Sequence, residues 1–181
     1  MFEIDHQQIF SLRGTGGEKF TAFCDSLIYA TIHYLSILLS DVHINQRVNA
    51  KDGGVDSKVD NGSEKDTTGY FLVKSIWQYK ATDAVDFLGT KKQTKKKNLK
   101  IEVNKPFAKS CIEEGFAYRL CIADYLTPQQ VNEIEVILTE CCREININSP
   151  PVKVLGSGRL LEWGPECPMV EMYPNSIVLS P

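Results

Sequence analysis

The spacing of apolar residues along this 181-residue chain changes abruptly near residue 40. From about Gly17 to Leu39, apolar residues recur every three or four positions, which predicts a long helix with one buried face. From Val42 to Asn49 they alternate with other residues, which predicts a strand with one buried face. Each element must bury its apolar side against another layer, so we expect a layered α/β domain.

Two further extended segments follow this strand. Gly53 and Gly54 permit a tight turn before an extended pattern at 55–59. The polar segment 61–69 then predicts the loop of a hairpin. Residues 70–80 are rich in aromatic and β-branched side chains and predict a third, central strand. The first three strands should therefore be linked by hairpins.

The second half of the chain alternates helices with strands. Residues 81–104 are polar and rich in lysine, and we expect a loop or a frayed helical segment there. Thr127, Pro128 and Gln130 predict a capped helix start, and Pro150 ends that helix. The other patterns predict a helix from Pro106 to Glu114, a strand from Phe116 to Ala123, a strand from Val152 to Leu155 and a turn or helix from Leu160 to Gly164. The fold class is therefore α/β, a single domain over residues 1–181 with a mixed central sheet flanked by helices.

Composition excludes several classes of protein. Lysine and arginine number 20 against 23 acids, and the formal net charge of −3 argues against a protein that coats nucleic acid with its whole surface. The apolar stretch 27–39 is too short to span a bilayer, and residues 1–10 lack the pattern of a secretory signal. We therefore expect a cytoplasmic protein without a membrane segment. Its six cysteines form no CxxC pair, which favours reduced, buried thiols over a zinc site.

Three polar residues at the ends of two predicted strands suggest chemistry. Asp56 follows the Gly53-Gly54 turn, and Gln78 and Lys80 end the third strand on one face, because side chains alternate along a strand. Hairpin-linked strands would bring the three together. A carboxylate and an amide oxygen suit Mg²⁺, and an adjacent ammonium can hold the attacking water or stabilise charge on a phosphate. This combination predicts phosphodiester hydrolysis, with Asp56, Gln78 and Lys80 as catalytic residues and with Asp56 and Gln78 as metal ligands.

The motifs DGGVD (52–56) and QYK (78–80) resemble those of the PD-(D/E)xK nuclease superfamily, which has the restriction endonuclease-like fold. They are most similar to its Mrr-like branch, whose last motif reads QxK. The segments RGTGGEKF, KPF, GFAYRLCIA and RLLEWGPECP also resemble parts of nuclease domains at the N-terminus of larger bacterial antiphage proteins. The resemblance extends from Arg13 to Met169 and implies an αβββαβ core followed by a further helix and strand.

The resemblance also implies roles for residues and partners. Many members add a glutamate from the first helix, and Glu18 is the nearest candidate for that third metal ligand, although its helical phase lies opposite the apolar face. The cofactor would be Mg²⁺, for which Mn²⁺ can substitute. The domain would cut double-stranded DNA in antiphage defence, as part of a longer protein whose regulatory domains activate it as a homo-oligomer.

Positive charge is concentrated after the third predicted strand. Six lysines and no acid lie between Lys91 and Lys100. They form either a solvated loop or a set of phosphate contacts, for which the candidates are Lys91, Lys92, Lys95, Lys96 and Lys97. Arg13, beside a glycine-rich helix entry, is a further candidate for a DNA phosphate. The rival hypothesis is a catalytically inactive module of the same fold that binds nucleic acid or a protein partner.

Overall fold

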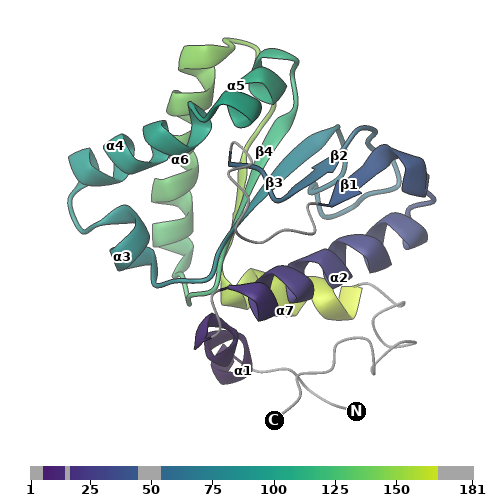
Figure 1. The fold of residues 1–181 in the computed structure, drawn as a ribbon, viewed down its shortest axis with the longest axis horizontal. Helices are drawn as coiled ribbons and strands as arrows, with labels where there is room; N and C mark the ends of the chain where they lie inside the picture. Colours follow the sequence, from purple (N-terminus) through teal and green to yellow (C-terminus); the bar gives the residue numbers. More distant parts are fainter. Residues whose placement is uncertain (1–5, 15–16, 45–53, 167–181) are drawn as a thin grey trace.

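A computed structural model describes residues 6–14, 17–44 and 54–166, in which a five-stranded sheet separates two groups of helices (Figure 1). The strands are β1 (Val42–Ile44), β2 (Ser57–Val59), β3 (Ser75–Lys80), β4 (Ala117–Ile122) and β5 (Lys153–Leu155). The α-helices are α1 (His6–Ser11), α2 (Glu18–Tyr34), α3 (Ala84–Leu88), α4 (Lys92–Val103), α5 (Pro106–Glu113), α6 (Pro128–Ile145) and α7 (Ser157–Glu166). Two short 3₁₀ turns, η1 (Leu12–Gly14) and η2 (Leu39–Asp41), precede α2 and β1. None of the described helices combines the length and apolar character that a membrane crossing needs.

The sheet is mixed, with the strand order β1-β2-β3-β4-β5. Strands β1, β2 and β3 pair antiparallel, whereas β3 pairs with β4 and β4 with β5 in parallel. A parallel pair requires a crossover, which α3, α4 and α5 supply between β3 and β4 and α6 supplies between β4 and β5. The predicted α/β class, with hairpin-linked strands followed by helical crossovers, is confirmed.

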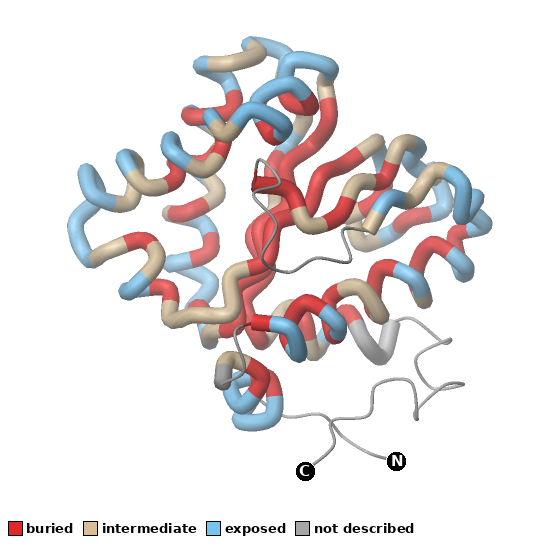
Figure 2. Tube along the Cα trace, in the orientation of Figure 1, coloured by how far each residue is buried: buried red, intermediate tan, exposed pale blue. Residues whose placement is uncertain are grey.

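The two faces of the sheet carry separate apolar cores. Ile76 of β3 packs with α3, α4, α5 and α6, whereas Trp77 and Tyr79 pack with α1, α2 and α7. Figure 2 shows buried residues continuing along the central strands between these two layers. Trp77 and Tyr79 are therefore core residues, as the alternation along β3 predicts. The cysteines at 24, 111, 121, 141 and 142 are free and buried, as predicted, and Cys167 lies outside the described residues.

The structure shortens two predicted elements and describes only the start of a third. The first long helix ends at Tyr34 rather than at Leu39, because Ser36 takes a left-handed conformation with φ 58° that a helix cannot continue through. Strand β1 is described as far as Ile44, and the rest of its predicted range lies outside the described residues. Strand β3 begins at Ser75 rather than at residue 70, since the buried Asp66 side chain accepts bonds from the amides of the preceding segment and holds it as a loop.

The lysine-rich segment 81–104 contains two helices, α3 and α4, rather than a loop or a frayed segment. Although this segment is polar overall, it contains two apolar residues, Leu99 and Val103, which lie one helical turn apart and are buried in the core beneath α3–α6. Packing of this narrow stripe fixes a helix whose overall composition is polar. By contrast, the predicted helix start at Thr127 is confirmed. The Thr127 hydroxyl accepts a hydrogen bond from the Gln130 backbone N–H, and the Gln130 side-chain oxygen accepts one from the Thr127 backbone N–H.

Candidate functional site

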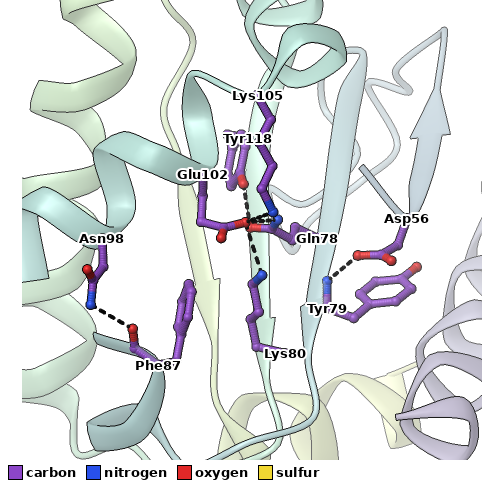
Figure 3. Close-up of polar contacts among 9 residues, drawn as sticks. All are labelled: Asp56, Gln78, Tyr79, Lys80, Phe87, Asn98, Glu102, Lys105 and Tyr118. Carbon is purple, nitrogen blue, oxygen red and sulfur yellow. Dashed lines mark hydrogen bonds and ion pairs between the residues drawn. The ribbon is translucent and has the colours of Figure 1, made fainter. Parts of the chain in front are cut away.

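Gln78 and Lys80 of β3 meet a glutamate of α4 on the face of the sheet that α3–α6 cover (Figure 3). Glu102 Oε2 accepts a hydrogen bond from Gln78 Nε2 and lies 3.0 Å from Lys80 Nζ. Lys105 Nζ donates to the same oxygen at 2.7 Å. One carboxylate oxygen of Glu102 thus accepts hydrogen bonds from the Gln78 amide and from the ammonium groups of Lys80 and Lys105.

Asp56, the residue that precedes β2, is fixed to the same end of β3. Its Oδ2 accepts the backbone N–H of Tyr79 at 2.7 Å, and its own N–H donates to the carbonyl of Trp77 at 2.8 Å. Tyr79 lies between Gln78 and Lys80 in the sequence, so Asp56, Gln78 and Lys80 gather at one end of the β2–β3 pair. In the view of Figure 3, Asp56 lies on the β2 side of β3 and Glu102 on the α4 side.

The Gln78 amide is held at both of its ends. Gln78 is 3% exposed, and its Oε1 accepts a 2.6 Å hydrogen bond from the hydroxyl of Tyr118 on β4. Burial, together with the nearby carboxylates of Glu102 and Asp56, raises the pKa of Tyr118 well above its usual range, so that hydroxyl stays a donor at neutral pH. The amide therefore points its nitrogen at Glu102.

Glu102 is ionised although it is largely buried, with 13% of its side chain exposed. Burial alone would raise its pKa, but the hydrogen bonds and positive charges of Lys105 and Lys80 outweigh that effect, and the pKa lies below its ordinary value. Sequence reasoning missed this residue because it did not assign a helix to 92–103. The signal was present: Glu102 is the only acid between Lys91 and Lys105, and it follows the buried Leu99 by three positions.

The glycine turn before Asp56 makes room for Lys105. Gly54 has φ 87°, and a Cβ at this position would collide with Cδ of the Lys105 side chain. Glycine therefore serves both the left-handed conformation and the passage of Lys105 toward Glu102.

Lys80 is partly accessible and has a second neighbour. Its side chain is 19% exposed, and Nζ lies 4.8 Å from the centre of the Phe87 ring, on the side of α3. Asn98 of α4 donates to the carbonyl of Phe87 at 3.0 Å and so ties α3 to α4 (Figure 3). The ammonium is thus enclosed by an anion and an aromatic face, with one side reaching solvent.

Glu18 does not lie among these residues. It is exposed in the first turn of α2, and α2 packs on the face of Trp77 and Tyr79 rather than on the face of Gln78. The acid of α2 that reaches the sheet is Asp25, which accepts bonds from Ser57 Oγ and the Tyr79 hydroxyl, both at 3.0 Å. Burial raises the pKa of Asp25 to about 6, against the lowering effect of those two bonds. Its place beside Cys24 and two residues before Leu27, on the apolar edge of the helix, was the available signal.

Arg13 is committed to contacts inside the chain. Its guanidinium binds the carboxylates of Asp83 and Asp124 and the carbonyl of Ala123, and 12% of its side chain is exposed. These contacts tie the entry of α2 to the segments that follow β3 and β4. A structural role thus accounts for the residue that the sequence suggested for a DNA phosphate.

The five candidate lysines between 91 and 97 divide into two groups. Lys95 and Lys96 pair with acids of α6, at 2.8 Å to Glu133 and 3.1 Å to Glu140, so these two candidates help to hold α4 on α6. Lys91, Lys92 and Lys97 are exposed. The exposed group remains the better candidate for phosphate contacts.

The donor set has the hard oxygens that Mg²⁺ prefers, namely the carboxylate of Asp56 and the side-chain oxygen of Gln78. Within the described ranges, no group of three or more His, Cys, Asp or Glu side chains is arranged to hold a metal ion. Comparison with protein-family models, curated proteins and solved structures finds no match for this chain.

Proposed function

We propose that this chain is a Mg²⁺-dependent nuclease domain of the PD-(D/E)xK class that hydrolyses phosphodiester bonds of double-stranded DNA. The observation that carries the proposal is the gathering of Asp56, Gln78 and Lys80 at one end of the β2–β3 pair. The strand order supports it, since an antiparallel β1-β2-β3 unit followed by a parallel β4 matches the core that the sequence motifs imply.

The residues of the site have complementary tasks in this reaction. Asp56 and Gln78 would hold the metal, whose chemistry is to polarise the phosphate and to lower the pKa of a bound water. To offer its oxygen, the Gln78 amide has to turn from the orientation in which its nitrogen faces Glu102. Lys80 supplies a positive charge for the phosphate, and the half-enclosed position of its ammonium strengthens that interaction over its value in water.

The biological part of the proposal rests on the resemblance of the sequence motifs. We propose that the domain is the cytoplasmic effector of an antiphage protein and that regulatory domains elsewhere in the full-length protein activate it by oligomerisation. The exposed Lys91, Lys92 and Lys97 would add contacts to DNA phosphates without sequence preference.

Cleavage of supercoiled plasmid tests the proposal. We expect the wild-type chain to nick and linearise plasmid in Mg²⁺ or Mn²⁺ and to be inactive in EDTA. Lys80→Ala and Asp56→Asn should each abolish cleavage. Lys109→Ala is the matched control, because Lys109 is an exposed lysine of α5, and it should cleave like the wild type. Cleavage that persists in EDTA or in Lys80→Ala would refute the assignment.

A specific observation also favours the second candidate, an inactive module of the same fold that binds nucleic acid or protein. Lys80 and both ends of the Gln78 amide are already bonded within the chain, as in a purely structural polar cluster. If this candidate is correct, no metal supports cleavage, while Lys80→Ala lowers the free energy of unfolding because it leaves Glu102 with fewer partners. The nuclease hypothesis instead predicts that Lys80→Ala removes activity from a folded protein.

A further inference from the structure

The proposed cation site is short of negative charge. Asp56 brings one carboxylate, and Gln78 is a neutral amide at the position where an acid would bring a second. The affinity of an oxygen site for a divalent cation depends on how many of its ligands are charged. A site made of Asp56 and Gln78 alone would therefore bind Mg²⁺ weakly.

Glu102 brings a carboxylate to the side chain of Gln78. Its Oε2 accepts a hydrogen bond from Gln78 Nε2 and lies 3.0 Å from Lys80 Nζ, so it stands beside both residues of the motif. In the view of Figure 3, Gln78 lies between Glu102, on the α4 side of β3, and Asp56, on the β2 side. The cation site would therefore receive one carboxylate from each side of β3.

Glu102 also has coordination capacity left. All the hydrogen bonds and ion pairs that the described residues make with it end on Oε2, which leaves Oε1 for another ligand. One of the bonded groups, Lys105, is 36% exposed and can turn into solvent when a cation replaces its charge. Lys105 therefore acts as a competitor for the position that the cation would take.

We infer that Glu102 is the second carboxylate ligand of the proposed divalent-cation site, supplied from α4 in place of the acid that β3 lacks at position 78. This inference rests on the proposed function. It assigns the role to a residue 24 positions beyond Gln78, on a helix that the sequence motif does not include.

Calorimetric titration of the 181-residue chain with Mn²⁺ alone, in the absence of nucleic acid, tests the inference. Glu102→Gln should weaken binding by about tenfold or more, since it removes a charged ligand and keeps the shape of the side chain. Lys105→Ala should strengthen binding, because it removes the competing ammonium. Glu133→Gln is the matched control, since Glu133 is also paired with a lysine of α4, and it should bind like the wild type.

A rescue variant separates a ligand from a merely structural residue. In the double variant Gln78→Glu/Glu102→Gln the carboxylate moves to β3, and we expect binding to recover to within about threefold of the wild type. Thermal unfolding of each variant establishes that it is folded. Loss of binding in Glu102→Gln with recovery in the double variant supports the inference.

Two results would overturn it, and they differ in what they say of the proposed function. If the wild type binds Mn²⁺ through Asp56, as shown by loss in Asp56→Asn, while Glu102→Gln binds equally well, Glu102 is not a ligand and the nuclease proposal stands. If the wild type binds no Mn²⁺, the metal-dependent function and this inference both fail.

Discussion

Replacing Asp25 with asparagine should make the protein more stable at neutral pH. Asp25 lies on α2 against the sheet, with its carboxylate bonded to Ser57 and to the Tyr79 hydroxyl. Asparagine keeps the acceptor oxygen for those donors and removes only the charge. The substitution therefore isolates the cost of ionising this buried carboxylate.

The size of the effect follows from the pKa of Asp25, which burial raises from its ordinary 3.8 to about 6 in the folded protein. These two pKa values differ by roughly 2. Each pKa unit corresponds to about 1.4 kcal/mol, so the difference corresponds to about 3 kcal/mol in the free energy of unfolding. The folded protein holds the Asp25 proton more tightly than the unfolded chain does. The resulting stability is fully present below about pH 4 and is lost as the pH rises through about 6. Because Asp25 keeps some contact with water, we expect the gain above pH 6 to be about 1–3 kcal/mol.

Urea denaturation at pH 4.5 and pH 8 measures this, with the fluorescence of the buried Trp77 and Trp163 as the probe. Asp25→Asn should be more stable than the wild type at pH 8, and this advantage should shrink to about a third of that size at pH 4.5, where most of the folded wild type carries a protonated Asp25. Asp86→Asn, which removes an exposed carboxylate, controls for the change in net charge. An equal difference at both pH values, or a loss of stability at pH 8, would refute the reasoning.

Three further predictions concern Arg13, Gly54 and the exposed lysines 91, 92 and 97. Arg13→Ala should lower the free energy of unfolding by about 2–4 kcal/mol in urea denaturation, because it leaves the carboxylates of Asp83 and Asp124 without their cation; a variant as stable as the wild type but weaker in DNA binding would instead assign Arg13 to a phosphate. Gly54→Ala should cost about 1–2 kcal/mol in the same assay, since alanine must adopt φ 87° and displace Lys105, and an unchanged stability would contradict the packing described for that turn. If DNA binds along α4, replacing Lys91, Lys92 and Lys97 with glutamine should reduce the slope of log K against log salt by up to about 3, roughly 0.9 for each lost phosphate contact, as measured by fluorescence anisotropy over a range of salt; an unchanged slope would place the DNA elsewhere.

Local patterns in the sequence predicted most of the backbone. The change from a helical to an alternating period near residue 40, the capping residues at Thr127 and the aromatic segment that ends at Lys80 all act over a few positions. They depend on backbone geometry and on which side chains share a face, and neither requires a distant partner. The same rule placed Gln78 and Lys80 on one face and Trp77 and Tyr79 in the core of the other.

The sequence did not predict structure that depends on contacts with residues far away in the chain. The lysine-rich segment forms α4 because Leu99 and Val103 pack on the sheet and Lys95 and Lys96 meet acids more than 35 positions away on α6. Nothing within the segment itself specifies those partners. The polar composition therefore predicted a loop or a frayed helical segment in place of the two helices α3 and α4.

The sequence by itself determined the order of the five strands, the helices α2, α5 and α6, the face that the β3 side chains take, and the three residues proposed for the site. Only the tertiary structure decided that Glu102 accompanies them and that Asp25 packs on the opposite face of the sheet. It also left Glu18 exposed and placed Arg13 inside a salt-bridge network. The physical reason is that periodicity fixes directions along one element, whereas charge partners depend on how separate helices dock on the sheet, and this docking is set by packing across the whole domain.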